Sequence, residues 1–223
     1  MSIVRSAVIA LGILLVAVAG CGSSDTGSAG SLVSESGLPA DAAVISDVEG
    51  DVRDGEGQKP PADARVADIT AAGIYLSETD LTLAVRQVDP IPSELVPATA
   101  ADGGSEWLVY TLFIADEQGN HLYMPRVMLD GSEWRPDVFD RGSGKSTPVE
   151  GLPDLSGSTL TFVFPLALMP DLPGSFKWGV GTEWGMTNAG DASGLVTFVD
   201  QATQDATEGF GSPYPIEWAA YPQ

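Results

Sequence analysis

Residues Trp107–Ala115 read WLVYTLFIA, a strongly apolar run that ends in the polar stretch Asp116–Asn120. A segment of this length that is apolar on both of its faces is typical of a central strand in a β-sandwich, where one sheet face meets the core and the other is also covered. The polar stretch after it has the composition of a turn between strands. We therefore take this run as the centre of an all-β domain.

The sequence on both sides of this run keeps a period of two residues. In Leu81–Val88 the side chains of Leu81, Leu83 and Val85 share one face, and Ser158–Phe164 and Phe176–Trp184 alternate in the same way. The chain holds 16 prolines and 26 glycines, and no window of twelve residues carries an apolar stripe at helical spacing. These patterns predict an antiparallel β-sandwich of about eight or more strands.

The N-terminus has the pattern of an export signal. Arg5 precedes an apolar run from Ala7 to Ala19 that is short for a bilayer span. The run ends in Val18-Ala19-Gly20-Cys21, which resembles the lipobox of bacterial lipoprotein signal peptides. That resemblance implies cleavage after residue 20 and acylation of Cys21, the only cysteine in the chain. The alternative is an ordinary secretory peptide with a buried free cysteine.

Residues 22–64 are rich in Gly, Ser, Ala, Asp and Pro and keep no persistent period, which predicts a flexible acidic linker. The acidic residues between Asp47 and Glu56 do not fit an EF-hand, because its sixth and twelfth positions would be Val52 and Gln58. We interpret them as solvated linker. The expected organisation is therefore a signal peptide at 1–20, the acylated cysteine and linker at 21–64, and the sandwich at 65–223.

Several strand motifs occur in a suggestive order: Asp68-Ile69, DLTLAV at Asp80–Val85, VYTLFIAD at Val109–Asp116, the TLTF strand closed by Pro165, and Phe176–Trp178. This order resembles the DOMON-like sandwiches that include carbohydrate-binding modules of the ninth family type. The resemblance covers about residues 65–210 and implies a module that binds sugars, haem or calcium. Haem-binding members use Met and His ligands, whereas His121 is the only histidine here, so the sequence argues against haem.

Two tryptophans are candidates for a ligand-binding surface. Sugar recognition needs flat apolar platforms beside hydrogen-bonding groups. Trp134 lies among charged residues, and Trp184 stands between Glu183 and Gly185, so we predict both as exposed platforms. Trp107 and Trp178 lie within apolar strands and are predicted to be core. The alternative is that all the tryptophans fill the sandwich or cover its ends.

Calcium is the candidate cofactor. Hard cations take oxygen ligands, usually from loop carboxylates and carbonyls. The densest set of carboxylates is Asp130, Glu133, Asp137 and Asp140. Asp68 and Asp200 form a second candidate set at strand edges, where related sandwiches hold a structural ion. No loop has a defining spacing, and the alternative is a solvated acidic surface.

Composition and motifs narrow the function. A formal net charge of −21 excludes simple nucleic-acid binding, which needs a basic face. Neither a nucleophile elbow nor a complete phosphate-binding loop is present, and so many carboxylates make any acidic pair uninformative. The acidity fits either solubility at an anionic envelope or adaptation to high salt.

The sequence therefore predicts an exported, lipid-anchored, non-catalytic binding module of the cell surface. Its ligand is expected to be a carbohydrate or another envelope polymer, and the membrane is reached through Cys21. The alternative is a structural lipoprotein that binds another envelope protein. A secreted hydrolase accessory or an enzyme is the third reading.

Overall fold

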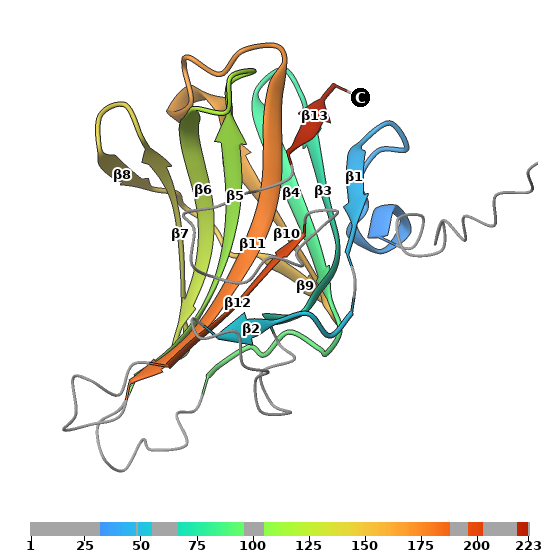
Figure 1. The fold of residues 1–223 in the computed structure, drawn as a ribbon, viewed down its shortest axis with the longest axis vertical. Helices are drawn as coiled ribbons and strands as arrows, with labels where there is room; N and C mark the ends of the chain where they lie inside the picture. Colours follow the sequence, from blue (N-terminus) through green and yellow to red (C-terminus); the bar gives the residue numbers. More distant parts are fainter. Residues whose placement is uncertain are drawn as a thin grey trace, which may run out of the picture.

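Two antiparallel sheets packed face to face form the molecule (Figure 1). The computed structural model describes residues 32–47, 49–54, 67–95, 105–187, 196–202 and 218–222. Within these residues there are thirteen strands, five in a small sheet and eight in a large one. The all-β sandwich expected from the sequence is confirmed.

Strand order in each sheet is as follows. The small sheet runs β1 (Ala43–Ser46), β3 (Ile69–Leu76), β4 (Asp80–Gln87), β10 (Thr159–Pro165) and β9 (Asp154–Ser156). The large sheet runs β2 (Arg53–Asp54), β12 (Val196–Ala202), β11 (Phe176–Thr187), β5 (Ser105–Ala115), β6 (His121–Asp130), β7 (Glu133–Asp140) and β8 (Lys145–Pro148). A further strand, β13 (Ala219–Tyr221), pairs with β11. One helical turn at 32–36 and the 3-10 turn η3 (Leu166–Leu168) complete the described elements.

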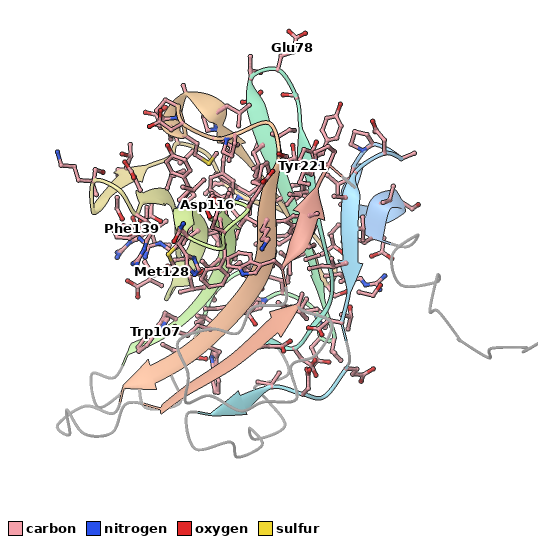
Figure 2. All side chains as sticks on the ribbon, turned by 45° about the horizontal axis from the view of Figure 1, so that its top comes forward. Glu78, Trp107, Asp116, Met128, Phe139 and Tyr221 are labelled. Atoms are coloured by element: carbon pink, nitrogen blue, oxygen red, sulfur yellow. The ribbon has the colours of Figure 1, made fainter. Side chains whose placement is uncertain are left out.

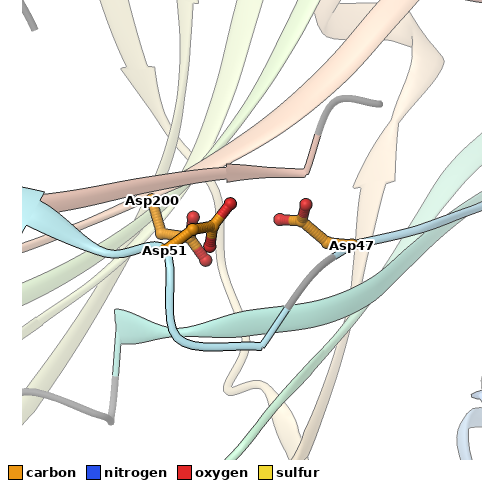
Figure 3. Close-up of side chains that lie close together, drawn as sticks. All are labelled: Asp47, Asp51 and Asp200. Carbon is orange, nitrogen blue, oxygen red and sulfur yellow. The ribbon is translucent and has the colours of Figure 1, made fainter. Parts of the chain in front are cut away.

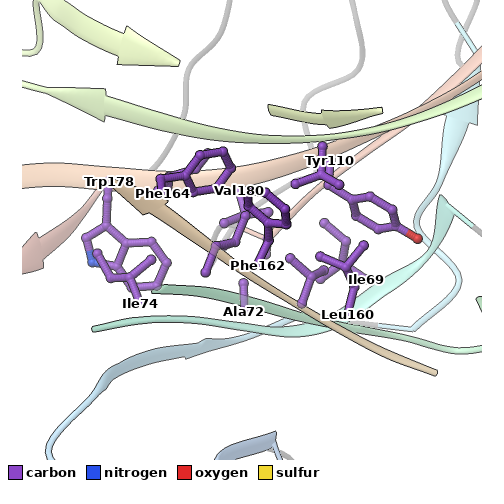
Figure 4. Close-up of a cluster of buried hydrophobic side chains, with 14 of the residues drawn as sticks. Ile69, Ala72, Ile74, Tyr110, Leu160, Phe162, Phe164, Trp178 and Val180 are labelled. Atoms are coloured by element: carbon purple, nitrogen blue, oxygen red, sulfur yellow. The ribbon is translucent and has the colours of Figure 1, made fainter. Parts of the chain in front are cut away.

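The apolar run that opened the sequence analysis is β5, and it lies between β6 and β11. Its inward side chains, Leu108, Tyr110, Leu112 and Ile114, are all fully buried. They meet inward residues of the small sheet such as Ile74 and Phe164 in one continuous core (Figure 4). The Tyr110 hydroxyl donates a hydrogen bond of 2.6 Å to Gln87 Oε1 of β4, so the two sheets are also joined by a buried polar contact.

The segment expected to be a linker is part of the fold where it is described. β1 pairs with β3, and β2 pairs with β12. Leu32 and Leu38 are buried against the outer face of the small sheet, in a second small core with Ala71 and Ala84. The prediction that the linker extends to residue 64 is therefore wrong for the described residues between 32 and 54. Residues 21–31 and 55–64, together with Cys21, lie outside the described residues.

A glycine explains how the N-terminal segment approaches so closely. A Cβ atom at Gly73 of β3 would lie 2.9 Å from Leu38 Cδ1 and 3.3 Å from a methyl carbon of Leu32. The first distance is shorter than van der Waals contact, so a larger residue at this position would force the Leu38 side chain to move. The small residues of β3 and β4 thus form a seat for residues 32–46.

Candidate functional site

Three aspartates from distant parts of the chain bring their carboxylates together (Figure 3). Asp47 follows β1, Asp51 precedes β2, and Asp200 is in β12. One carboxylate oxygen from each lies within 4.8 Å of the others. With the neighbouring Asp68, which directly precedes β3, we call this group the acidic centre. It lies where the N-terminal segment passes from the small sheet to the large one.

Local backbone contacts fix the acidic centre. The Asp47 amide donates to the Thr70 carbonyl oxygen at 3.0 Å, which continues the β1–β3 pairing. The next turn passes through Gly50, whose φ of +89° favours glycine. The Gly50 amide donates to both carboxylate oxygens of Asp68, at 3.1 and 2.9 Å. Asp68 therefore holds the turn that carries Asp51 toward Asp200.

The acidic centre combines burial with mutual repulsion between carboxylates. Asp68 and Asp200 are each only 3 % exposed. The Ile69 amide donates to Asp200 Oδ2 at 2.5 Å, which favours the ionised form, but burial and the charges of Asp47, Asp51 and Asp68 outweigh it. These causes, burial first, raise the pKa of Asp200 well above its usual range. The protonated form of Asp200 is therefore favoured relative to an aspartate in water.

The spacing of the acidic centre matches a hard divalent cation. Calcium binds oxygens at about 2.3–2.6 Å, so two of its ligands can be separated by no more than roughly 5 Å. The three carboxylates meet that limit. The sequence had singled out Asp68 and Asp200 for this chemistry, and the structure adds Asp47 and Asp51, which had been interpreted as linker. The signal that was missed is the alternation of acids after an apolar AVIS segment at Ala43–Ser46.

The other predicted metal group is not assembled. Asp130 and Glu133 each accept a hydrogen bond from Arg135, and Asp137 accepts two from Arg126. Asp140 caps its own turn, accepting from the backbone amides of Gly142 and Ser143 and from the Ser143 hydroxyl. Within the described residues these four carboxylates do not converge on one point, and the prediction of a shared cation there is wrong. Arg126 and Arg135 lie in the same stretch of sequence and neutralise three of the four carboxylates, Asp130, Glu133 and Asp137.

The structure places Trp134 and Trp184 on the core side of the large sheet and Trp107 on its outer side, which is the reverse of the prediction for these three residues. Trp184 is 3 % exposed, belongs to the core, and donates from Nε1 to Glu106 Oε1 at 2.6 Å, so its assignment as a surface platform is wrong. Trp134 points inward from β7 and is a half-buried residue packed against the core. Trp178 is fully buried, as expected, whereas Trp107 is half-buried on the opposite side of β5 from Leu108.

Trp107 lies flat on the outer side of the large sheet. A Cβ atom at Gly185 of β11, its cross-strand neighbour, would overlap the indole ring, so only glycine lets the ring settle there. The indole Nε1 donates to Glu183 Oε1 at 3.2 Å. The ring is thus held by one hydrogen bond and one sheet surface, and it is half-buried among the residues that the structure describes.

A set of alternating polar and apolar side chains surrounds Trp107. We define the outer face as the outward side chains of β5, β6 and β7: Trp107, Val109, Thr111, Arg126, Met128, Asp130, Glu133, Arg135 and Asp137. All of them are half-buried or exposed. Figure 2 shows Trp107, Met128 and Phe139 along this side of the large sheet.

Both arginines of the outer face are held by carboxylates. Arg126 donates to both Asp137 oxygens, at 2.8 and 2.5 Å, and to the Ser146 hydroxyl at 2.9 Å. Arg135 donates to Asp130 and Glu133, each at 2.8 Å. Hydrogen bonding from Arg135 is the main reason why the pKa of Glu133 lies below its usual range. Pairing rather than burial therefore sets the charges of this face.

Comparison with known proteins adds no family. No protein-family model matches the sequence, and no curated protein matches it significantly. The resemblance to DOMON-like sandwiches and to lipoprotein signals therefore stays a prediction. In the part of the chain that the structure describes, none of the helices has the length and apolar character needed to cross a bilayer.

Proposed function

We propose that this protein is an exported, lipid-anchored and non-catalytic binding module of the cell surface, with a carbohydrate or another envelope polymer as ligand. The observation that carries the proposal is the outer face. It presents an indole ring seated on Gly185 beside preorganised hydrogen-bonding groups. The anchor is Cys21, in a segment that resembles a lipobox. The lipid places the sandwich on the outer side of the membrane, in contact with envelope polymers.

The chemistry of the outer face suits a polyhydroxyl ligand. A sugar ring has an apolar CH face that packs on an indole and a rim of hydroxyls that pair with charged or amide groups. Trp107 of β5 supplies the flat apolar surface, and the Arg126–Asp137 pair supplies donors and acceptors on the next two strands, β6 and β7.

The charges of the outer face also support a non-catalytic role. Glycoside hydrolysis needs one carboxyl group that keeps its proton near neutral pH. Arg135 lowers the pKa of Glu133, which is the opposite tuning. The carboxyl group with a raised pKa, Asp200, is 97 % buried in the acidic centre rather than on this face.

Co-sedimentation with an insoluble bacterial cell-wall polysaccharide, stripped of protein by protease, tests the proposed function. We expect the full chain to sediment with it. We expect Trp107→Ala to weaken binding about tenfold or more, as truncation of a central aromatic contact does. Binding only to envelope material that retains its proteins would contradict the proposal and favour the structural lipoprotein.

The acidic centre supports a second proposal, that the module holds a structural calcium ion. Asp47, Asp51 and Asp200 would supply ligands, and the ion would join the N-terminal segment to β12. An ion that binds only the folded state stabilises it by about 2.7 kcal/mol at a hundredfold excess over its Kd. We expect excess calcium to raise the Tm of the full chain relative to chelator, and Asp200→Asn to remove most of this response. Equal melting curves for the wild type in calcium and in chelator would reject the ion.

A further inference from the structure

We propose that the outer face binds an uncharged glycan chain, and that anionic polymers are poor ligands for it. This inference rests on the proposed function and names its ligand class. It comes from the arrangement of charges on the outer face, where cations and anions are already bonded to one another.

Both arginines of the outer face are already paired with carboxylates. Arg126 is bonded to Asp137 through a two-bond pair, and Arg135 lies between Asp130 and Glu133. An anionic polymer would have to displace these carboxylates, in a chain whose formal net charge is already −21. Two arginines face three carboxylates here, so the outer face as a whole is negative. Charge complementarity therefore disfavours an anionic polymer.

The registers of the strands arrange the outer face in successive rows. One row aligns Trp107 with Asp130 and Glu133, and the next aligns Val109 with Met128 and Arg135. The third aligns Thr111 with Arg126 and Asp137. Side chains on one face of a strand recur about every 6.6–6.8 Å, so these rows span on the order of 13 Å. This length accommodates more than one ring of a glycan.

Apolar and polar groups alternate within this area. Trp107 and Val109 of β5 and Met128 of β6 are apolar neighbours in the strand registers, with the indole on the β11 side and the ion pairs on the β6–β7 side. A hydroxyl can donate to a carboxylate and accept from a guanidinium at the same time, so one hydroxyl can bridge an ion pair. Uncharged hydroxyls are thus complementary to paired charges, whereas a single ionic group is not.

Preorganisation strengthens the assignment. Arg126 is fixed by three hydrogen bonds to Asp137 and Ser146 and lies over the ring of Phe139, 5.7 Å from its centroid. Side chains that are ordered before binding lose little conformational entropy when a ligand arrives. The outer face therefore binds a ligand without first rearranging its polar groups.

Affinity electrophoresis of the full chain through gels containing one dissolved polysaccharide at a time tests the inference. The probes are a neutral β-glucan, a neutral mannan and polygalacturonate, each at low and at high salt. We expect at least one neutral polymer to retard the protein equally at both salt concentrations. We expect polygalacturonate to have no effect at either salt concentration, because the chain is strongly negative and the arginines of the outer face are already paired. An ionic interaction would be recognised by its loss at high salt.

Matched variants locate the site. Trp107→Ala and Arg126→Ala should each weaken retardation by the neutral polymer about tenfold. Arg86→Ala is the control, since Arg86 lies on the outer side of β4 in the small sheet and donates to the Thr70 hydroxyl in a comparable way. Circular dichroism and Tm confirm that each variant is folded.

Other outcomes separate the two proposals. Retardation by polygalacturonate alone, lost at high salt, overturns the uncharged ligand but leaves a polymer-binding module. Retardation by a neutral glycan that is unchanged in both Trp107→Ala and Arg126→Ala overturns the outer face as the site. Absence of retardation by either neutral polymer overturns this inference, whereas the proposed function depends on the co-sedimentation result.

Discussion

The acidic centre and the outer face use the same residue type in opposite ways. In the acidic centre Asp47, Asp51, Asp68 and Asp200 face one another with the last two almost fully buried, and the pKa of Asp200 is raised. On the outer face every carboxylate of β6 and β7 that points outward is bonded to an arginine. The sign of a neighbour's charge and the degree of burial, rather than the number of acids, decide what a cluster of aspartates can do.

The largest expected effect tests whether the outer face is a surface rather than part of the core. Trp184→Ala should destabilise the protein by ~3–5 kcal/mol, because a buried tryptophan leaves a cavity. Trp107→Ala should cost about 1 kcal/mol, since its ring is half-buried on the outer side of the sheet and not in the core. Chemical denaturation of both variants measures the difference. Equal losses of stability would show that Trp107 is a core residue and would contradict its role in ligand binding.

A pH titration of stability in chelator should separate the two regions. The folded state holds the Asp200 proton more tightly than the unfolded chain does, so stability rises as pH falls through the raised pKa of Asp200. The pKa of Glu133 is lowered, chiefly by Arg135, so its contribution is lost as pH falls below the usual value of 4.5. We expect the Tm to increase from neutral to mildly acidic pH and to decrease below about pH 4.

The control for this titration is Asp200→Asn, which should remove the increase and keep the decrease. Excess calcium should also flatten the rise in the wild type, because the cation replaces the proton. A Tm that falls steadily from neutral pH in chelator would show that the acidic centre is not under electrostatic strain.

The smallest expected effect concerns the ion pair of the outer face. Arg126→Ala should lower stability by ~1 kcal/mol or less, because Arg126 is partly solvated and exposed ion pairs contribute little. The same variant should bind the neutral glycan about tenfold more weakly while its Tm changes little. A loss of stability comparable to that of Trp184→Ala would indicate that the pair supports the sheet rather than a ligand.

The fold could be predicted because its signal is local. Alternation in Leu81–Val88 and the apolar run at Trp107–Ala115 identify strands without knowledge of their partners. β1 and β2 were missed since four and two residues are too few for a period to emerge from an acidic, glycine-containing stretch. They are strands only because β3 and β12 offer them unpaired edges.

The sites were harder to predict because they depend on contacts between distant residues. Asp51 and Asp200 lie close together although they are far apart in the sequence, and no local sequence pattern around either residue predicts this contact. For Trp184 the useful signal was its phase, which it shares with the core residues Trp178 and Val180, and the polar neighbour Glu183 was misleading. For Trp107 a strand that is apolar on both sides does not reveal which side faces inward.

If Cys21 carries a lipid as proposed, the packing of residues 32–46 on Gly73 limits how far the domain can stand from the membrane. Because Leu32 is already buried on the small sheet, the chain between Cys21 and the folded body is the ten residues 22–31, not the longer linker expected from composition. Even fully extended, eleven Cα–Cα steps reach only about 36–40 Å. A lipid on Cys21 would therefore hold the domain close to the membrane through a short tether, which joins the domain at the outer side of the small sheet. The outer face, on the opposite sheet, would be the surface presented away from the bilayer, toward the polymers it is proposed to bind.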